Sequence, residues 1–237
     1  MPERSSSSTP GPALLVAFRD VLGEGELRAA LAGFGGDDRA TSALRATAGD
    51  ALDLSLAAHR AALLGWLRAW GCRHLRVADS GRSSAALARW WRRWSDGLPP
   101  HGRSIVGLRE RDLAHLEQAY AALASLPAAR RATVAGDVTV TFGDTAAAKA
   151  LFALRPLAFP PWDEPIRLAF GRSRGEGELY RRYVELTGDA VRGCAARLGV
   201  GVSRLPTALG RPSSTPAQVV DEYLWIAVRS PVGPATT

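Results

Sequence analysis

One lysine and one aspartate are the residues of this chain whose types and spacing could do chemistry together. Lys149 is the only lysine among 30 basic residues, and all the others are arginines. A buried lysine gives up its proton far more readily than a buried arginine, and it can then act as a nucleophile or base. Asp163 follows 14 residues later, close enough for the chain to fold its carboxylate back beside the amine. A coding bias toward arginine that left one lysine by chance explains the same count, so the pair is a hypothesis.

The residues around Lys149 indicate a crowded position. Residues 143–151 are mostly small, and small side chains let another helix or a ligand approach closely. Burial favours the neutral amine that a Schiff-base nucleophile requires, whereas pairing with a carboxylate favours the ammonium. Asp163 opens the next helix, where free backbone N–H groups favour a carboxylate. The alternatives are a plain N-cap for Asp163 and a structural ion pair or surface lysine for Lys149.

Apolar periodicity predicts a mostly α-helical chain of seven to nine helices in a single multi-helix domain over residues 13–229. Ser/Pro/Gly-rich residues 1–12 and residues 230–237 are predicted to be disordered tails. The strand-like residues 133–142 have no partner of equal quality, so we interpret them as a segment that leads into the next helix. The helices are expected at residues 13–22, 24–34, 50–70, 83–96, 110–125, 145–154, from 163, 176–198 and 215–229.

The segment from Thr145 to Asp163 resembles part of the helix-hairpin-helix DNA glycosylases. In that superfamily a hairpin leads into a helix, a loop follows, and an aspartate opens the next helix. Asp163 matches this aspartate, which in the family supports loss of the base or activates the nucleophile. Together with residues 221–225, the segment also resembles a group of bacterial proteins whose function has not been established. The matched segments cover about a fifth of the chain, and the mostly helical body fits the same fold.

The chain departs from the family pattern at two places. The family's hairpin is glycine-rich, and only Gly143 stands in that stretch here. When the aspartates are aligned, the lysine of the lyase-active members falls on Ala146, about one helical turn before Lys149. Residues i and i+3 share a helix face, so Lys149 can still point into the same pocket. The resemblance thus implies a base-excision glycosylase but leaves its lyase activity open.

Charge favours an anionic partner. The net charge is +7 and the sequence pI is about 10.3, as in many nucleic-acid-binding proteins. We expect Arg155 and Arg167 to contact phosphates near the pair and Trp162 to form a wall of the pocket against a flipped base. Arg92 and Arg93 lie in an Arg/Trp-rich segment and are candidate DNA contacts, although a core stripe of Leu87, Trp91, Trp94 and Leu98 with a solvated basic face explains this segment better.

Other constellations are weaker. Cys72 and Cys194 fit no metal or redox spacing, and the histidines have no ligand neighbours, so we expect no metal and no cofactor. The helix containing Asp221 and Glu222 is interpreted as a docking helix, with Arg204 or Arg211 as partners of the acids. No signal peptide or membrane span is recognised, which favours the cytoplasm and no membrane partner. Oligomeric state cannot be read from the sequence.

Three functions remain open at this point. The first is a DNA-directed protein, in its most specific form a base-excision DNA glycosylase, with Asp163 as the catalytic carboxylate and Lys149 in the same pocket. The second is a helical nucleic-acid-binding module without catalysis. The third is a helical protein with no nucleic-acid role, in which the arginines reflect coding bias.

Overall fold

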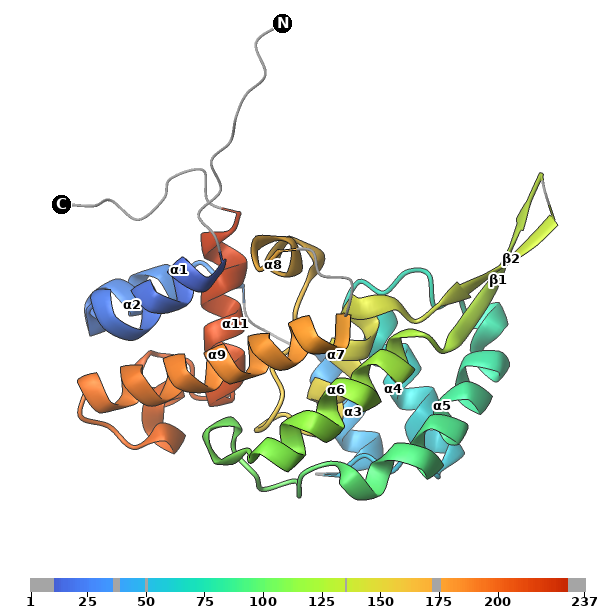
Figure 1. Ribbon diagram of the computed structural model, residues 1–237, viewed down its shortest axis with the longest axis horizontal. Coiled ribbons are helices and arrows are strands. Elements are labelled where there is room, and N and C mark those ends of the chain that lie inside the picture. Colours follow the sequence, from blue (N-terminus) through green and yellow to red (C-terminus); the bar gives the residue numbers. More distant parts are fainter. Residues whose placement is uncertain (1–10, 36–38, 50, 135, 172–175, 230–237) are drawn as a thin grey trace, which may run out of the picture.

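The computed structural model describes residues 11–35, 39–49, 51–134, 136–171 and 176–229 (Figure 1). The two tails expected to be disordered lie outside these residues, except that residues 11 and 12 begin the first helix rather than end a tail. No helix in the described part of the chain is both long and apolar enough to cross a membrane.

The described chain is mostly α-helical, as the periodicity predicts. It contains eleven α-helices: α1 (Gly11–Val16), α2 (Glu24–Ala32), α3 (Arg39–Ala48), α4 (Ala57–Ala69), α5 (Ser80–Trp94), α6 (Glu110–Ala124), α7 (Gly143–Leu154), α8 (Glu164–Ala169), α9 (Glu176–Arg197), α10 (Leu205–Ala208) and α11 (Pro216–Ala227). A π-helical turn over Ala17–Val21 extends α1, and short 3-10 turns join several of the others.

Three expectations about these elements are wrong. The helix α3 was missed, because Arg39–Ala48 buries only Leu44 and so carries a weak apolar stripe. Its successor α4 begins at Ala57 rather than at residue 50. Residues 133–142 are not an unpaired segment, because β2 (Gly136–Thr141) pairs antiparallel with β1 (Pro127–Thr133). The partner strand was missed because its alanines and arginines have low strand propensity.

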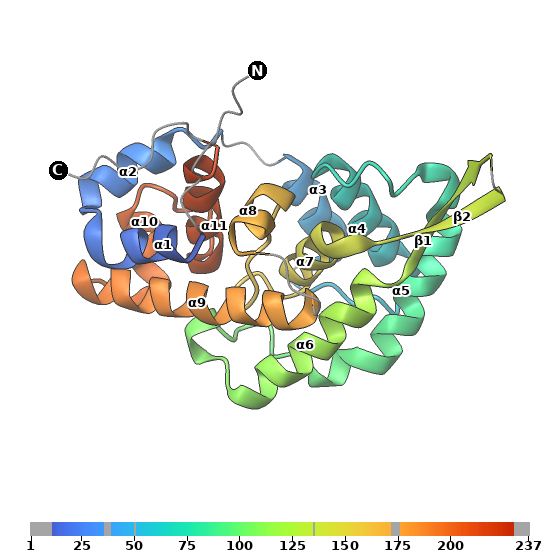
Figure 2. The same cartoon turned by 45° about the horizontal axis from the view of Figure 1, so that its top comes forward.

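The helices form two groups on either side of α8. On one side, α1 and α2 pack against α11, so the beginning and end of the described chain lie side by side (Figures 1 and 2). On the other side lie α3 to α7 and the β-hairpin. The long helix α9 packs against both α6 and α11 and so joins the two groups through one continuous core.

The β1–β2 hairpin projects from the second group (Figure 1). Its base is anchored: Ala128 and Ala129 are buried, and the Ser83 hydroxyl on α5 donates to the Ala128 carbonyl over 2.7 Å. An isolated two-stranded hairpin is marginally stable in water, so this attachment to α5 is what orders it. Most residues of β2 are exposed.

Helix α5 packs in a different register from the expected stripe. Leu87 and Trp90 are buried, and the Trp90 indole N–H donates to the Ala119 carbonyl over 2.9 Å. Trp91 and Trp94 are only half-buried. The expected stripe therefore omitted Trp90, the most buried tryptophan of α5.

Candidate functional site

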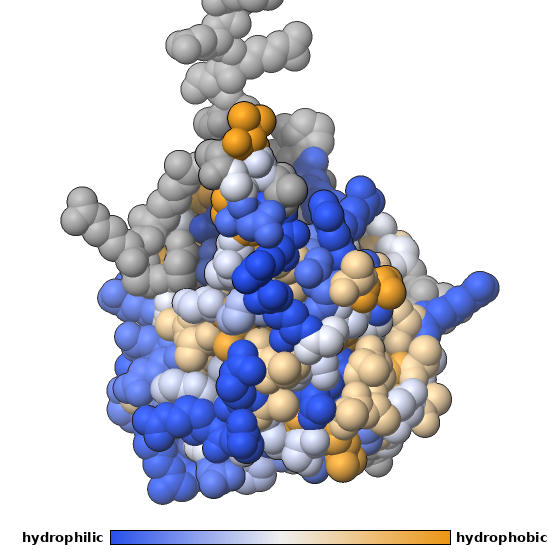
Figure 3. All heavy atoms as spheres, turned by 90° about the vertical axis from the view of Figure 1, so that its right-hand side faces the viewer, coloured by the Kyte–Doolittle hydropathy of each residue, from blue (hydrophilic) through white to orange (hydrophobic). Residues whose placement is uncertain are grey.

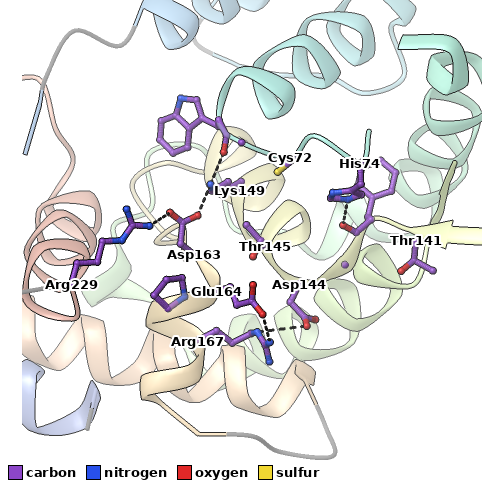
Figure 4. Close-up of a pocket in the computed structure, with 15 residues that line it drawn as sticks. Cys72, His74, Thr141, Asp144, Thr145, Lys149, Asp163, Glu164, Arg167 and Arg229 are labelled. Atoms are coloured by element: carbon purple, nitrogen blue, oxygen red, sulfur yellow. Dashed lines mark hydrogen bonds and ion pairs between the residues drawn. The ribbon is translucent and has the colours of Figure 1, made fainter. Parts of the chain in front are cut away.

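Lys149 and Asp163 meet in the structure. The Lys149 Nζ lies 2.6 Å from Asp163 Oδ1 and donates to the Trp70 carbonyl over 2.7 Å (Figure 4). The lysine side chain is 8% exposed and the aspartate side chain 27%. Arg229 approaches the other carboxylate oxygen at 3.9 Å. The ammonium is thus held on two sides, while the carboxylate keeps contact with water.

Helix α7 places the lysine deep in the fold. Its neighbours Ala146, Ala148 and Ala150 are completely buried, which lets the surrounding helices close around the amine. The last turn of α4 presents the Trp70 carbonyl, and the amine lies 5.7 Å from the centre of the Trp70 ring. Trp70 stacks on Phe152 at 5.6 Å, so the ring beside the amine is itself supported.

A cluster of aromatic side chains holds the loop that presents Asp163. Trp162 stacks on Tyr183 at 5.1 Å. The hydroxyls of Tyr180 and Tyr183 donate to the carbonyls of Pro160 and Pro161 over 2.8 and 3.3 Å. Asp163 occupies the N-cap position of α8, yet its side chain makes no capping hydrogen bond. The plain cap is therefore not its role here, because the carboxylate turns to Lys149 instead.

Two cavities lie on either side of the lysine–aspartate pair. The first, called the polar cavity, has a volume of about 610 Å³ and borders Lys149, Asp163, Trp70 and Asp144. The second, called the aromatic cavity, has a volume of about 580 Å³ and also borders Lys149, Asp163 and Trp70. Both volumes fall within the roughly 300–1,000 Å³ typical of small-molecule sites. The pair therefore lines both cavities and marks the boundary between them.

The polar cavity brings charges of both signs together. Arg167 lies 3.9 Å from Asp144 and 3.9 Å from Glu164, and Figure 4 shows these side chains beneath the pair. His74 is joined through Nε2 to the Phe142 carbonyl over 2.8 Å. Cys72 also borders this cavity, but burial raises the pKa of its thiol to about 11, so the nucleophilic thiolate is scarce at neutral pH.

The aromatic cavity combines ring faces with a few polar groups. Phe34, Trp70, Phe152 and Trp225 border it. Asp221 borders it from α11 and lies 3.3 Å from the Tyr183 hydroxyl. Desolvation, and after it the negative charge of Asp163, raises the pKa of Asp221 well above its ordinary value. A carboxyl group in that state can donate a hydrogen bond to a ligand.

Two residues expected at the site are buried. Arg155 donates to the Pro99 carbonyl and to the Leu154 carbonyl, and burial lowers its pKa to about 10. It therefore ties the α7–α8 loop to the preceding helices and is not placed to reach a phosphate. Trp162 borders the aromatic cavity, but it has no exposed surface. In this conformation its ring supports Asp163 and cannot stack on a base.

The remaining expected residues divide between the site and the surface. Arg167 borders the polar cavity. Arg92 and Arg93 are exposed on the last turn of α5 and border none of the described cavities. The acids of α11 have different roles, because Glu222 is buried and paired with Arg211 at 2.7 Å, whereas Asp221 faces the cavity.

Sequence reasoning missed Trp70, Asp144 and Asp221 as site residues. Asp144 could have been found, because it lies in the first turn of the helix that carries Lys149. Trp70 contributes a backbone carbonyl, which no residue type reveals. Asp221 is distant in the chain and reaches the pair only because α11 returns to the centre of the fold.

Comparison of the chain with protein-family models, curated proteins and solved structures finds no match.

Proposed function

We propose that this protein is a DNA glycosylase, which removes a base from DNA in the cleft that contains Lys149 and Asp163. The observation that carries the proposal is the 2.6 Å contact between the only lysine and the aspartate that matches the family's catalytic carboxylate, at the boundary of two cavities. The sequence resemblance rests on these residues, and the mostly helical fold agrees with it.

Asp163 is the catalytic carboxylate in this proposal. A water molecule attacks C1′ of the sugar and passes its proton to Asp163. The N-glycosidic bond breaks, and its electron pair leaves on the base nitrogen, which takes up a proton from solvent. Partial positive charge on the sugar in the transition state is stabilised by the nearby carboxylate. Lys149 and Arg229 contact that carboxylate on its two oxygens and orient it.

Lys149 offers a second route. Its ammonium can pass a proton to Asp163, because the two groups are in contact. The neutral amine then attacks C1′, and the base leaves with the electron pair of the glycosidic bond. The product is a covalent amine–sugar intermediate that opens to a Schiff base, as in lyase-active glycosylases. The contact gives the amine a proton acceptor for this route, although pairing with a carboxylate favours the ammonium and Lys149 stands one turn later than the family's lysine.

The aromatic cavity suits the extrahelical base. The aromatic side chains of Phe34, Trp70 and Trp225 border it, and flipped bases are held by stacking and by hydrogen bonds to their edges. Gln218 and Asp221 of α11 supply polar groups at the same cavity. A base that passes the lysine–aspartate pair would leave its sugar beside Asp163.

The test is base release from duplex oligonucleotides carrying single altered bases, detected as alkali-labile sites. Wild type is compared with Asp163→Asn and with the control Asp144→Asn. The control aspartate borders the same cavity and is 25% exposed, close to the 27% of Asp163. We expect Asp163→Asn to lose at least about 100-fold in rate, as enzymes do without a charge-stabilising group, and Asp144→Asn to lose much less. Equal losses would remove Asp163 from the chemistry.

A binding module without catalysis remains the second candidate. The absence of a glycine-rich hairpin before α7 favours it. It predicts salt-sensitive binding to DNA without base release from any substrate.

A further inference from the structure

A groove lined by arginines lies between the β-hairpin and the loop that follows α4. It has a volume of about 250 Å³, and Arg73, Arg76, Arg130 and Arg131 border it. His74 borders both this arginine groove and the polar cavity. The groove is therefore next to the cavity that leads to the lysine–aspartate pair.

Most of these guanidinium groups have no partner. All four arginines are exposed, and Arg130 is the one among them with an ion pair, to Asp137 at 3.8 Å. In the described residues the side chains of Arg73, Arg76 and Arg131 make no hydrogen bond or ion pair. By contrast, Arg167, Arg181, Arg192 and Arg211 are all matched with carboxylates. An uncompensated positive cluster of this kind attracts phosphates.

The hairpin that carries two of these arginines has the shape of an arm. It is held at its base by α5 and projects beyond the helices (Figure 1). Val134 at its turn is fully exposed, and Val138 on β2 is about half exposed. Figure 3 looks at this end of the molecule and shows hydrophilic side chains interspersed with apolar ones. A two-stranded ribbon fits the major groove of B-form DNA.

We propose that the arginine groove and the β1–β2 hairpin grip the phosphate backbone of a DNA duplex and deliver it to the polar cavity. This inference deepens the proposed function and rests on it, since it names where the duplex lies. The partner follows from the chemistry of the groove, because guanidinium groups spaced along a groove match a chain of phosphates. The chain has no glycine-rich hairpin to contact the phosphate backbone of DNA. In this proposal the arginine side chains of the β1–β2 hairpin make that contact instead.

The test measures affinity for an undamaged 20-base-pair duplex by fluorescence anisotropy between 50 and 200 mM salt. The variant Arg73→Gln/Arg131→Gln is compared with the control Arg182→Gln/Arg204→Gln, which removes the same charge from exposed positions that border none of the described cavities. Each lost phosphate contact lowers the slope of log K against log salt by about 0.9. Over this fourfold salt range, wild type should therefore lose about 12-fold more affinity than the groove variant. The control should behave as wild type.

The outcomes separate this inference from the proposed function. Equal slopes for wild type and the groove variant would overturn the inference, and so would an equal change in the control. Base release is measured on the same preparations. If the groove variant binds DNA and releases the base like wild type, the proposed duplex contact is refuted and the proposed glycosylase activity is not. If wild type binds through the groove yet releases no base, the glycosylase activity is refuted and the duplex contact is not.

Discussion

Neutralising Asp163 should destabilise the fold more than removing Lys149. Taking one partner from a buried ion pair costs about 3–5 kcal/mol when the remaining charge is left in the interior. Lys149 is 8% exposed, so Asp163→Asn leaves an ammonium held mainly by the Trp70 carbonyl. Because Asp163 itself is 27% exposed, we reduce the expected cost to about 2–3 kcal/mol. In Lys149→Met the carboxylate keeps water and Arg229, so the cost should be about 1 kcal/mol.

A double-mutant cycle measures the pair directly. Urea unfolding of wild type, Lys149→Met, Asp163→Asn and the double variant should give a coupling free energy of about 1–2 kcal/mol. For a chain of this length the Asp163→Asn midpoint should fall by roughly 4–12 °C. The double variant should be no less stable than Asp163→Asn, because the stranded ammonium is gone. A coupling near zero, or a larger cost for Lys149→Met, would refute the description of Lys149 as the buried partner.

Three further predictions concern neighbouring groups. Burial raises the pKa of Asp221 in the folded state, so its contribution to stability is greatest below the unfolded pKa of about 3.9 and is lost as pH rises through the folded pKa. Asp221→Asn should therefore be more stable than wild type above neutral pH, in urea unfolding across pH 4–9; equal stability at pH 8 would contradict this. Borohydride reduction with abasic-site DNA should trap wild type but not Lys149→Arg, and an adduct that survives the substitution would exclude Lys149 as its source. Arg155→Met should lower the thermal midpoint while leaving DNA affinity unchanged, because Arg155 bonds to carbonyls inside the fold; weakened DNA binding in the folded variant would restore its phosphate role.

Four neighbouring side chains influence the pKa of the Asp221 carboxyl. The groups that act on this carboxyl are Asp163 and Glu222, which raise its pKa, and Lys149 and Tyr183, which lower it. Asparagine keeps the shape and can still accept from the Tyr183 hydroxyl. The comparison therefore isolates the charge.

Helical periodicity predicted most of the fold because core-facing helices carry their own apolar stripes. It predicted α9 and α11 within a few residues. It failed at α3, where a single leucine is buried, and at β1, where alanines and arginines pair with a better strand. In both places contacts with the next element, α4 for α3 and β2 for β1, decide the structure, and residue type alone does not show them.

The sequence suggested the pairing of Lys149 with Asp163 as a hypothesis, because 14 residues separate the two and Asp163 opens the helix that follows α7. The roles of Trp162 and Arg155 were not. Both were expected to face a ligand, yet the tyrosines of α9 enclose Trp162 and the Pro99 carbonyl binds Arg155. Whether an aromatic ring or a guanidinium faces a cavity or the core depends on side chains that arrive from other helices.

The central claim is that Asp163 stabilises a positively charged sugar in DNA, and one binding measurement tests it without knowledge of the target base. The ligand is a duplex in which a protonated pyrrolidine replaces one deoxyribose, as a mimic of the charged transition state. Transition-state analogues bind at least about 100-fold more tightly than substrates, so wild type and Asp144→Asn should prefer this duplex to plain DNA by that factor, and Asp163→Asn should show no preference. Equal affinity of wild type for both duplexes would contradict the account.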